Sequence, residues 1–525
     1  MSVTVSDCIV LLISFLLLNA YLKKRRNHSG LPLPPGPGRL PILGNFFDVP
    51  VRASWETYAS WAKQYGDIMS IEVFGETIVI INSIEIAHKL LEKRGAVYSD
   101  RPAIPAYELM KYDFNLSMAR YGRYWKSGRK ITDHNLRQSA AMAYRPMQSR
   151  KVAEFLRKLA QTPDHVFDHI RHLTASVVMS FTYGLEIADS NDRYVALAEI
   201  TNVRASGTVL PGATPLNTFP MLKYLPTWLP GMGFKKDALI AAEDVQEAVN
   251  APFGFVKSEL QKGTAVSSFV LRSLELSSES DETDINDEVI KNTASSIYLG
   301  DGSTVSILST FFMVLVLHPG IQERAQEEID AIVGRERLPK FEDRPHMPYI
   351  DAICRELVRW RMVTPLAVPH ATTEDDVYEG YFIPKVGQSN IAYLVFLPMF
   401  NVQRCDRSIL HDPAVYLDPD VFRPERFLAP DGSLVEDPNL TSAFGFGRRI
   451  CPGRFFADAS IWTVVSSVLS SFTVKRAIDA RGNEIPVKVE FNDDRVLCHP
   501  YPFKCSIAPR DKRAEGLIFQ TASEA

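Results

Sequence analysis

The sequence predicts a mostly α-helical protein with small β elements, folded as one large domain. From about residue 84 onward, apolar residues recur at three- and four-residue steps, the period of an amphipathic helix. This period occupies residues 84–93, 121–130, 148–159 and 166–183. Residues 67–82 are instead rich in β-branched side chains on both sides of Gly75-Glu76, a pattern typical of a hairpin. No long flexible linker interrupts the middle of the 525 residues, so one domain is favoured over several.

Composition and charge describe an ordinary globular chain. Hydrophobic residues make up 46% of the sequence, charged residues 23%, and the formal net charge is −4. Nothing therefore attracts the whole chain to nucleic acid, and we expect no nucleic-acid partner. Six cysteines in so long a chain lack the density of a disulfide scaffold, which suits a reducing compartment. We expect no structural disulfide among Cys8, Cys354, Cys405, Cys451, Cys498 and Cys505.

Residues 1–26 are predicted to be a membrane anchor with a basic stop-transfer segment. Residues 8–22 are almost wholly apolar, and two lysines and two arginines follow at 23–26. Extended back to Val3, the apolar run has about 20 residues, enough for a helix to cross a bilayer. A cleaved signal peptide is the alternative, but the charges follow the apolar run and no small-residue cleavage site comes next. The positive-inside rule then places the rest of the chain in the cytosol.

Residues 27–44 are predicted to form a proline-rich hinge. Four prolines lie within residues 31–38, and proline fixes φ and removes an N–H donor, so this stretch is a stiff spacer. One large globular domain is expected over residues 45–508, with a C-terminal tail over residues 509–525.

The stretch from Phe444 to Gly453 is the strongest indication of function. Gly447 and Gly453 bracket the single Cys451, and Arg449 lies two residues before the cysteine. A thiolate binds iron strongly, and glycines let the backbone approach the metal and donate N–H groups to the sulfur. The alternative is a buried structural cysteine beside a glycine turn.

This Phe-x-x-Gly-x-Arg-x-Cys-x-Gly spacing resembles that of the cytochrome P450 family of haem-thiolate monooxygenases, and the likeness extends from about residue 31 to residue 508. The resemblance implies haem b as cofactor, with the Cys451 thiolate as the proximal ligand of its iron. It also implies that Arg449 pairs with a haem propionate and that Phe444 packs below the porphyrin near the sulfur. Thiolate ligation pushes electron density onto the iron and favours O–O cleavage.

Trp125 and Arg129 lie four residues apart and would share one face of a helix. They match the Trp-x-x-x-Arg of the family, which implies that both hydrogen-bond a haem propionate. A surface Trp–Arg stack is the alternative. His370, ten residues before Gly380, falls where the family often has another propionate-binding cation.

Basic residues accompany these two segments. If they surround the sulfur side of the haem, they form a docking patch for an acidic electron-donor protein; a solvated helix face is the alternative. The resemblance implies NADPH-cytochrome P450 reductase as the donor, with cytochrome b5 as a second candidate. The residues are Arg123, Lys126, Lys130, Arg448 and Arg454.

Residues 205–234 carry five prolines among apolar side chains. In the family this position is a lid over the substrate channel that often dips into the membrane, which implies a lipophilic substrate entering from the bilayer. An apolar connector packed on the core is the alternative.

A long helix is predicted over residues 286–318, ended by Pro319. Its centre holds two glycines, each costing about 1 kcal/mol relative to alanine, so a local opening for a ligand is expected there. By resemblance this is the oxygen-activating segment, where the family usually places an acid followed by threonine. Here glycine and serine take those places and the acid is displaced by one residue, which predicts a working but leaky monooxygenase. The candidate catalytic residues are Asp301, Gly302, Ser303 and Thr304.

Glu356 and Arg359 lie three apart on a predicted helix and could form a salt bridge. The resemblance implies a buried structural network in which Arg426 completes the pair behind the cysteine loop; an exposed pair of little value is the alternative.

One segment lies outside the family pattern. About a dozen extra apolar residues fall within 388–403, as a real insertion or an incorrectly spliced segment, just before the cysteine loop.

Three Asn-x-Ser/Thr sequons, at Asn27, Asn115 and Asn439, should stay unglycosylated if the domain is cytosolic.

The sequence is therefore interpreted as a single-pass protein of the endoplasmic reticulum membrane that oxidises a lipophilic small molecule with O₂ and electrons from NADPH. It looks most like fungal secondary-metabolism members of the family, some of which hydroxylate aromatic or terpenoid scaffolds, and residues 288–306 resemble fungal tryptamine hydroxylases. Two alternatives stay open. One is a haem-thiolate isomerase or dehydratase acting without O₂, and the other is a degenerate, non-enzymatic membrane protein.

Overall fold

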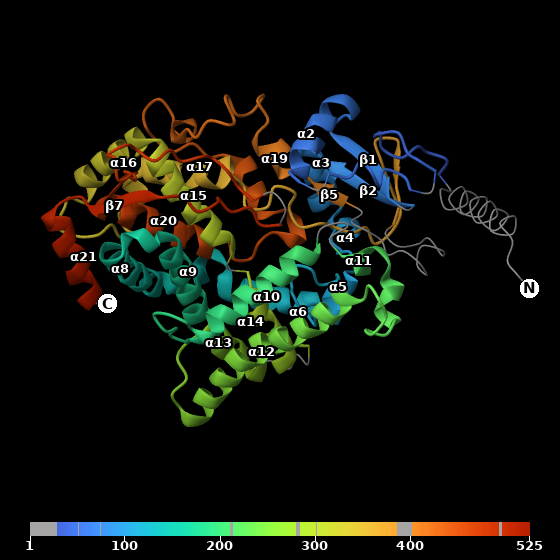
Figure 1. The fold of residues 1–525 in the computed structure, drawn as a ribbon, viewed down its shortest axis with the longest axis horizontal. Helices are drawn as coiled ribbons and strands as arrows, with labels where there is room; N and C mark the ends of the chain where they lie inside the picture. Colours follow the sequence, from blue (N-terminus) through green and yellow to red (C-terminus); the bar gives the residue numbers. More distant parts are fainter. Residues whose placement is uncertain are drawn as a thin grey trace, which may run out of the picture.

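The computed structural model describes residues 29–524 apart from residues 42, 51, 74, 210–213, 280–283, 301, 386–401 and 493–495. The predicted anchor, Asn27, Asp301 and most of the extra segment within 388–403 lie outside the described residues. Within them the chain is mostly helical with small sheets, which confirms the predicted fold class (Figure 1).

Three small sheets make up the β structure of the described residues. Strands β1 (Ile68–Val73) and β2 (Glu76–Ile81) pair antiparallel with Val73 opposite Glu76, which confirms the predicted hairpin. A short strand, β5 (Val402–Arg404), joins β2 in parallel. The other two sheets are β3 (Asp376–Tyr378) with β4 (Tyr381–Ile383), and β6 (Phe472–Arg476) with β7 (Cys505–Pro509). Figure 1 shows the β1–β2 hairpin and β7 at opposite ends of the molecule.

Helices account for most of the remaining described residues, and all four predicted helical ranges fall on them. A π-helical turn over His88–Lys93 continues α3. The helices are α2 (Ser54–Tyr65), α3 (Ile84–Ala87), α4 (Gly95–Tyr98), α5 (Pro105–Leu109), α6 (Arg123–Leu136), α7 (Gln138–Ala141), α8 (Arg145–Gln161), α9 (Val166–Tyr183), α10 (Arg193–Val209), α11 (Pro215–Thr218), α12 (Gly233–Lys262), α13 (Phe269–Glu279), α14 (Asp287–Tyr298), α15 (Gly302–Leu317), α16 (Pro319–Ile332), α17 (Pro348–Trp360), α19 (Asp406–Leu410), α20 (Arg454–Ser471) and α21 (Lys512–Glu524).

The predicted long helix spans residues 287–317 and is interrupted at its centre, where the two glycines predicted a local opening. The Asn286 side chain caps α14 by accepting from the N–H of Val289, but α14 ends at Tyr298 and α15 begins at Gly302. The Gly300 N–H bonds to the carbonyl of Ile297, a tighter three-residue step that ends the α-helical pattern. Glycine stabilises a helix poorly, so ending the α-helical pattern at Gly300 costs little stability.

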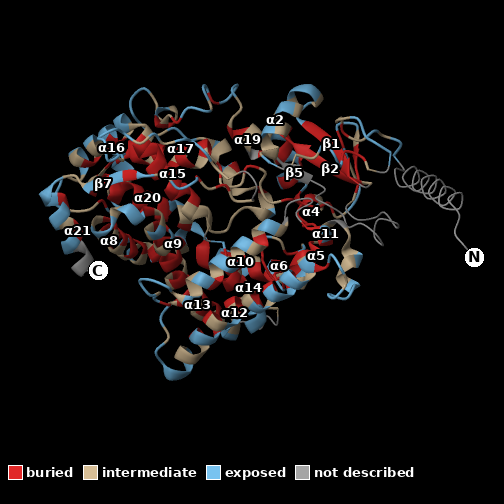
Figure 2. Ribbon diagram, in the orientation of Figure 1, coloured by how far each residue is buried: buried red, intermediate tan, exposed pale blue. Residues whose placement is uncertain are grey.

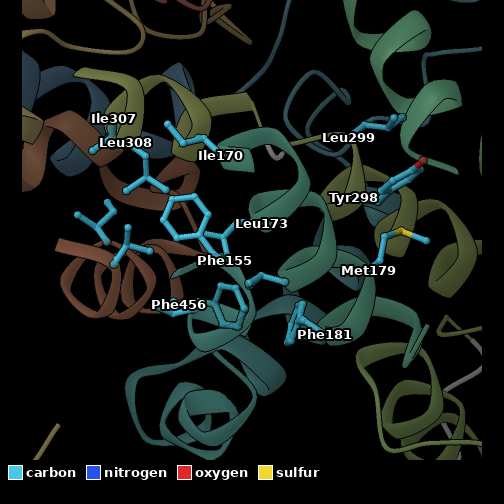
Figure 3. Close-up of a cluster of buried hydrophobic side chains, with 14 of the residues drawn as sticks. Phe155, Ile170, Leu173, Met179, Phe181, Tyr298, Leu299, Ile307, Leu308 and Phe456 are labelled. Carbon is cyan, nitrogen blue, oxygen red and sulfur yellow. The ribbon is translucent and has the colours of Figure 1, made fainter. Parts of the chain in front are cut away.

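The stretch 287–317 is the one span among the described residues that is long and apolar enough to cross a membrane. However, 71% of its most apolar window is buried inside the protein, as expected of a core helix. Figure 2 shows α15 and α20 among the most deeply buried elements. Phe155 of α8, Leu173 and Phe181 of α9, Leu308 of α15 and Phe456 of α20 meet in one apolar cluster (Figure 3).

Both ends of the described chain pack on this body. The carbonyls of Pro34 and Pro35 accept hydrogen bonds from the Ser70 hydroxyl and N–H, so the predicted hinge is fastened to β1. The predicted C-terminal tail contains α21, which contacts α8 and buries Ile518.

Candidate active site

A cavity of about 610 Å³ lies inside the protein, lined by segments that are far apart in the sequence. They include α6, α9, α10, α15, the segment 362–370, the loop 443–453 and the segment 496–499. The structure brings together at this cavity all ten of the described residues that the sequence predicted for catalysis and cofactor binding. These are Trp125, Arg129, Gly302, Ser303, Thr304, His370, Phe444, Arg449, Cys451 and Gly453.

The cysteine loop is shaped by its own backbone. The Cys451 N–H donates to the carbonyl of Phe444 at 2.7 Å, which closes the loop. Gly447 has a φ of 51°, and a Cβ there would lie 2.6 Å from the carbonyl oxygen of Leu91. Only glycine lets the loop press this closely on the π-helical turn. The result is a fixed turn that presents Cys451 to the cavity.

The Cys451 thiol is half-buried and lines the cavity. The other four cysteines that the structure describes are buried, and none of them lines it. A Cβ on Gly453 would lie 3.9 Å from the sulfur, so the glycine keeps the space beside the thiol open. Burial raises the pKa of the Cys451 thiol, while a hydrogen bond from the Gly453 backbone and the charges of Arg129 and Arg454 act to lower it. These donors favour the thiolate form that binds metals.

Arg449 is a largely buried cation whose hydrogen bonds all go to backbone carbonyls. It donates to Ser99 and Ala119 at 2.8 Å each, and its guanidinium lies 4.4 Å from the ring of Trp125. Burial lowers the pKa of Arg449 to about 10, and no ion pair of Arg449 occurs within the described residues. A buried charge of this kind is stabilised by an anionic group, and the cavity beside it can supply one.

Trp125 and Arg129 do not form the surface stack that was their alternative. Trp125 is only 5% exposed, and Arg129 donates to the carbonyl of Ile450, which ties α6 to the cysteine loop. His370 is also buried, and its Nδ1 lies 2.7 Å from the carbonyl of Tyr98, so Nδ1 donates there. The three side chains thus line the cavity from two separate segments.

Comparison with known proteins agrees with this geometry. The family model described as Cytochrome P450 matches residues 34–506. The chain is 37% identical to cytochrome P450 monooxygenase 208 of Postia placenta over 96% of this chain and 95% of that protein. It is 38% identical to cytochrome P450 monooxygenase claR of Ampulloclitocybe clavipes, over 98% of this chain and 93% of that one.

The chain belongs to the cytochrome P450 family. It is a cytochrome P450 monooxygenase with haem as its cofactor. It is also similar to the tryptamine 4-monooxygenase of Psilocybe cyanescens, at 34% identity over 96% of this chain and 98% of that one.

The residues at the cavity fit a haem. The group is a flat apolar ring with two carboxylates, and it needs one thiolate. Cys451 would supply the sulfur, and Arg449 makes no ion pair among the described residues, although the charge of Asp100 acts on it. Arg129 is paired with Asp133 at 3.1 Å and still lines the cavity. Within the described residues the cavity of this P450 therefore has cations that would hold the propionates and a thiol that would hold the iron.

The break between α14 and α15 opens onto the same cavity. Ser303 lines it, with its Oγ 3.5 Å from the carbonyl of Gly300. A Cβ on Gly302 would lie 3.0 Å from Cδ1 of Leu497, so the side chain of Leu497 fills the space next to the glycine. An acid at position 302 would have to displace Leu497. Asp301 lies outside the described residues, and its proton-delivery role stays a prediction.

Glu356, Arg359 and Arg426 form one buried charge network, not an exposed pair. The side chains of Glu356 and Arg359 are both fully buried, and Arg359 Nε lies 2.7 Å from Glu356 Oε2. Arg426 Nε lies 3.0 Å from Glu356 Oε1. Glu356 also accepts from the backbone N–H of Arg423, and Arg359 donates to the carbonyl of Leu410. The network lies outside the cavity lining and fastens α17 to the segment before the cysteine loop.

Sequence reasoning missed several cavity residues. Arg101 is buried and donates to the carbonyls of Ser117, Val368 and Pro369, which ties three segments together. Leu497 enters from near the C-terminus. No spacing signal marks these residues, because each reaches the cavity through tertiary packing.

Proposed function

We propose that this P450 oxidises a lipophilic small molecule of aromatic or terpenoid type, with O₂ and electrons that originate from NADPH. The observation that carries the proposal is the Cys451 thiol at a cavity lined mostly by apolar side chains. An apolar cavity with few polar groups favours a lipophilic ligand. The printed name of the Psilocybe cyanescens relative, tryptamine 4-monooxygenase, supports an aromatic scaffold.

The residues at the cavity indicate which roles belong to the haem and which belong to the protein. Bound haem supplies the oxidising chemistry at its iron, and the protein supplies ligation, orientation and protons. Cys451 Sγ would hold the iron, while Arg449, Arg129, Trp125 and His370 would orient the group through its carboxylates. Ser303 Oγ, at the helix break, passes a proton into the cavity.

We also propose that electrons arrive through NADPH-cytochrome P450 reductase docked beside the cysteine loop, with cytochrome b5 as a second donor. Arg123, Lys126, Lys130 and Arg448 are exposed there. Lys126 and Arg448 both lie over the ring of Tyr121, at 5.3 Å each, so they belong to one patch. Complementary charge steers such encounters and makes them dependent on salt.

The test is reconstitution of the purified full chain with the reductase and a panel of aromatic and terpenoid compounds. We expect products that carry one oxygen atom from labelled O₂, and only when NADPH is present. Turnover without O₂ would support the isomerase or dehydratase alternative. Absence of a thiolate-type absorption band in the reduced, CO-bound protein would support the non-enzymatic one.

We propose attachment to the endoplasmic reticulum membrane through residues 1–26, with the catalytic domain in the cytosol. Residues 205–234, the lid segment, offer a second contact with lipid. Their exposed apolar side chains include Met221, Tyr224 and Trp228. Deleting residues 1–26 is expected to release most of the protein from microsomes, because the remaining apolar contact is small. Complete retention of the truncated chain would make the lid segment the main attachment.

Ser303→Ala is expected to increase the leak of electrons to hydrogen peroxide. Loss of the Ser303 hydroxyl removes one hydrogen bond, so product formed per NADPH should fall by roughly twofold to tenfold. The measurement is the ratio of product and peroxide to NADPH consumed. Thr310→Ala on the same helix is the control, because its hydroxyl bonds to the carbonyl of Ser306 outside the cavity lining. An unchanged ratio in Ser303→Ala would remove the proton role from this residue.

A further inference from the structure

Two polar side chains meet on the cavity wall between α5 and α10, which lie side by side (Figure 1). Tyr112 follows α5, is buried, and donates from its hydroxyl to Oδ1 of Asn202 on α10 at 3.4 Å. Both residues line the cavity. Neither is one of the residues placed at the haem above.

The ring of Tyr112 is held in place by aromatic neighbours. It lies edge-on to Tyr107 at 4.8 Å and tilted against Phe114 at 5.5 Å. Tyr107 in turn donates to the carbonyl of Ala205 on α10, at 3.4 Å. Burial raises the pKa of Tyr112, so its hydroxyl stays protonated at neutral pH. The packing of its ring therefore holds the Tyr112 hydroxyl beside Asn202 on the cavity wall.

The amide of Asn202 retains hydrogen-bonding capacity. Its Oδ1 accepts from Tyr112, whereas its NH₂ group has no acceptor among the residues that the structure describes. An amide carries two N–H donors. A ligand in the cavity that carries an oxygen acceptor can satisfy them, and a purely hydrocarbon ligand cannot.

The free donors of Asn202 select the kind of polar ligand. A protonated amine carries only N–H donors and no lone pair, so it cannot accept a hydrogen bond from the NH₂ group of Asn202. A neutral alcohol or carbonyl oxygen can accept one.

We propose that Asn202 and Tyr112 form a substrate subsite that binds a neutral oxygen acceptor, a hydroxyl or carbonyl group, and discriminates against protonated amines. The proposal depends on the proposed function in one respect, because it takes the ligand to be a substrate. The binding preference itself is independent of turnover. It assigns this P450 a lipophilic substrate that already carries a hydroxyl or carbonyl oxygen.

The test uses matched alcohol and amine pairs on three scaffolds: tryptophol with tryptamine, phenylethanol with phenethylamine, and geraniol with geranylamine. Dissociation constants are measured on the haem-loaded full chain from the ligand-induced change in absorption, and calorimetry serves as a second readout. We expect at least one alcohol to bind about tenfold more tightly than its amine. An alcohol-to-amine affinity ratio that is the same in the wild type and in Asn202→Leu, or no binding of any alcohol, would overturn the proposal, because coordination of an amine nitrogen to the iron contributes equally in both proteins.

Variants assign the preference to the two residues. Asn202→Leu and Tyr112→Phe are each expected to weaken alcohol binding by about threefold to tenfold, the effect of one lost hydrogen bond. Asn202→Asp is expected to shift the alcohol-to-amine ratio toward the amine. Ser206→Ala is the matched control, because Ser206 lines the cavity from α10 but its hydroxyl bonds to the carbonyl of Val203 in its own helix.

Equal affinity ratios in the wild type, Asn202→Leu and Asn202→Asp would overturn the assignment. Because binding is read without turnover, a failed product assay with an intact alcohol preference would count against the proposed function alone. Oxidation of a substrate with no alcohol preference would count against the subsite alone.

Discussion

Cys451→Ala is expected to abolish the thiolate-type absorption band of the reduced, CO-bound protein and all NADPH-dependent product formation. The substitution removes the one described cysteine that lines the cavity. Alanine offers no ligand, and the neighbouring groups that stabilise the thiolate, the Gly453 N–H and the charges of Arg129 and Arg454, cannot bind iron. The expected effect is therefore complete loss and not a graded decrease.

Cys505→Ala is the matched control for this experiment. Cys505 lies on β7, away from the cavity lining, and the substitution has the same chemical size. It should keep the band and the activity. If Cys451→Ala retained the band, the iron ligand would be another cysteine and the site assignment would be wrong. Circular dichroism of both variants separates loss of the ligand from loss of the fold.

The parts of the site that the sequence predicted are those fixed by short-range geometry. The hairpin around Gly75 needs only β-branched residues on both sides of a turn, and Trp125 and Arg129 share a helix face because they are four residues apart. The cysteine loop combines a thiol, three glycines and two arginines within the ten residues 444–453. Such local patterns do not depend on the tertiary structure, so they can be recognised from the sequence alone.

The parts that the sequence could not predict depend on contacts between distant segments. Leu497 lies nearly 200 positions after Gly302 and still fills the space beside it. Asn202 on α10 meets Tyr112 only because α10 packs against α5. The two glycines predicted a local opening in the helix over residues 286–318, but the helical period did not reveal that α14 ends at Tyr298 and α15 begins at Gly302.

The Glu356 network has one feature that the sequence predicted and one that only the tertiary structure reveals. The spacing of Glu356 and Arg359 predicted a pair, but an exposed pair and a buried one have the same spacing. The structure resolves the choice, since neither side chain is accessible to solvent. Burial changes the energetics: an exposed pair contributes about 0 to 1 kcal/mol, whereas removal of one partner from a buried pair leaves an uncompensated charge.

Glu356→Ala is accordingly expected to lower the free energy of unfolding by about 3 to 5 kcal/mol. It leaves Arg359 and Arg426 buried side by side without the carboxylate that bonds to both. Since Glu356 also fixes the backbone N–H of Arg423, which precedes the cysteine loop, loss of haem during purification should accompany the lower stability.

The matched comparison is Glu436→Ala, because Glu436 pairs with Arg355 of the same helix at 3.2 Å but is 90% exposed. That variant should change the free energy of unfolding by no more than about 1 kcal/mol. Urea unfolding followed by circular dichroism gives both values, and haem content is measured on the same samples. Equal, small effects in the two variants would mean that the buried network does not hold the loop, and haem retention would then depend on the contacts of Arg449 and Arg129 inside the cavity. A large loss confined to Glu356→Ala would instead place the support of the haem site outside the cavity, in the ion network that joins α17 to the segment before Cys451.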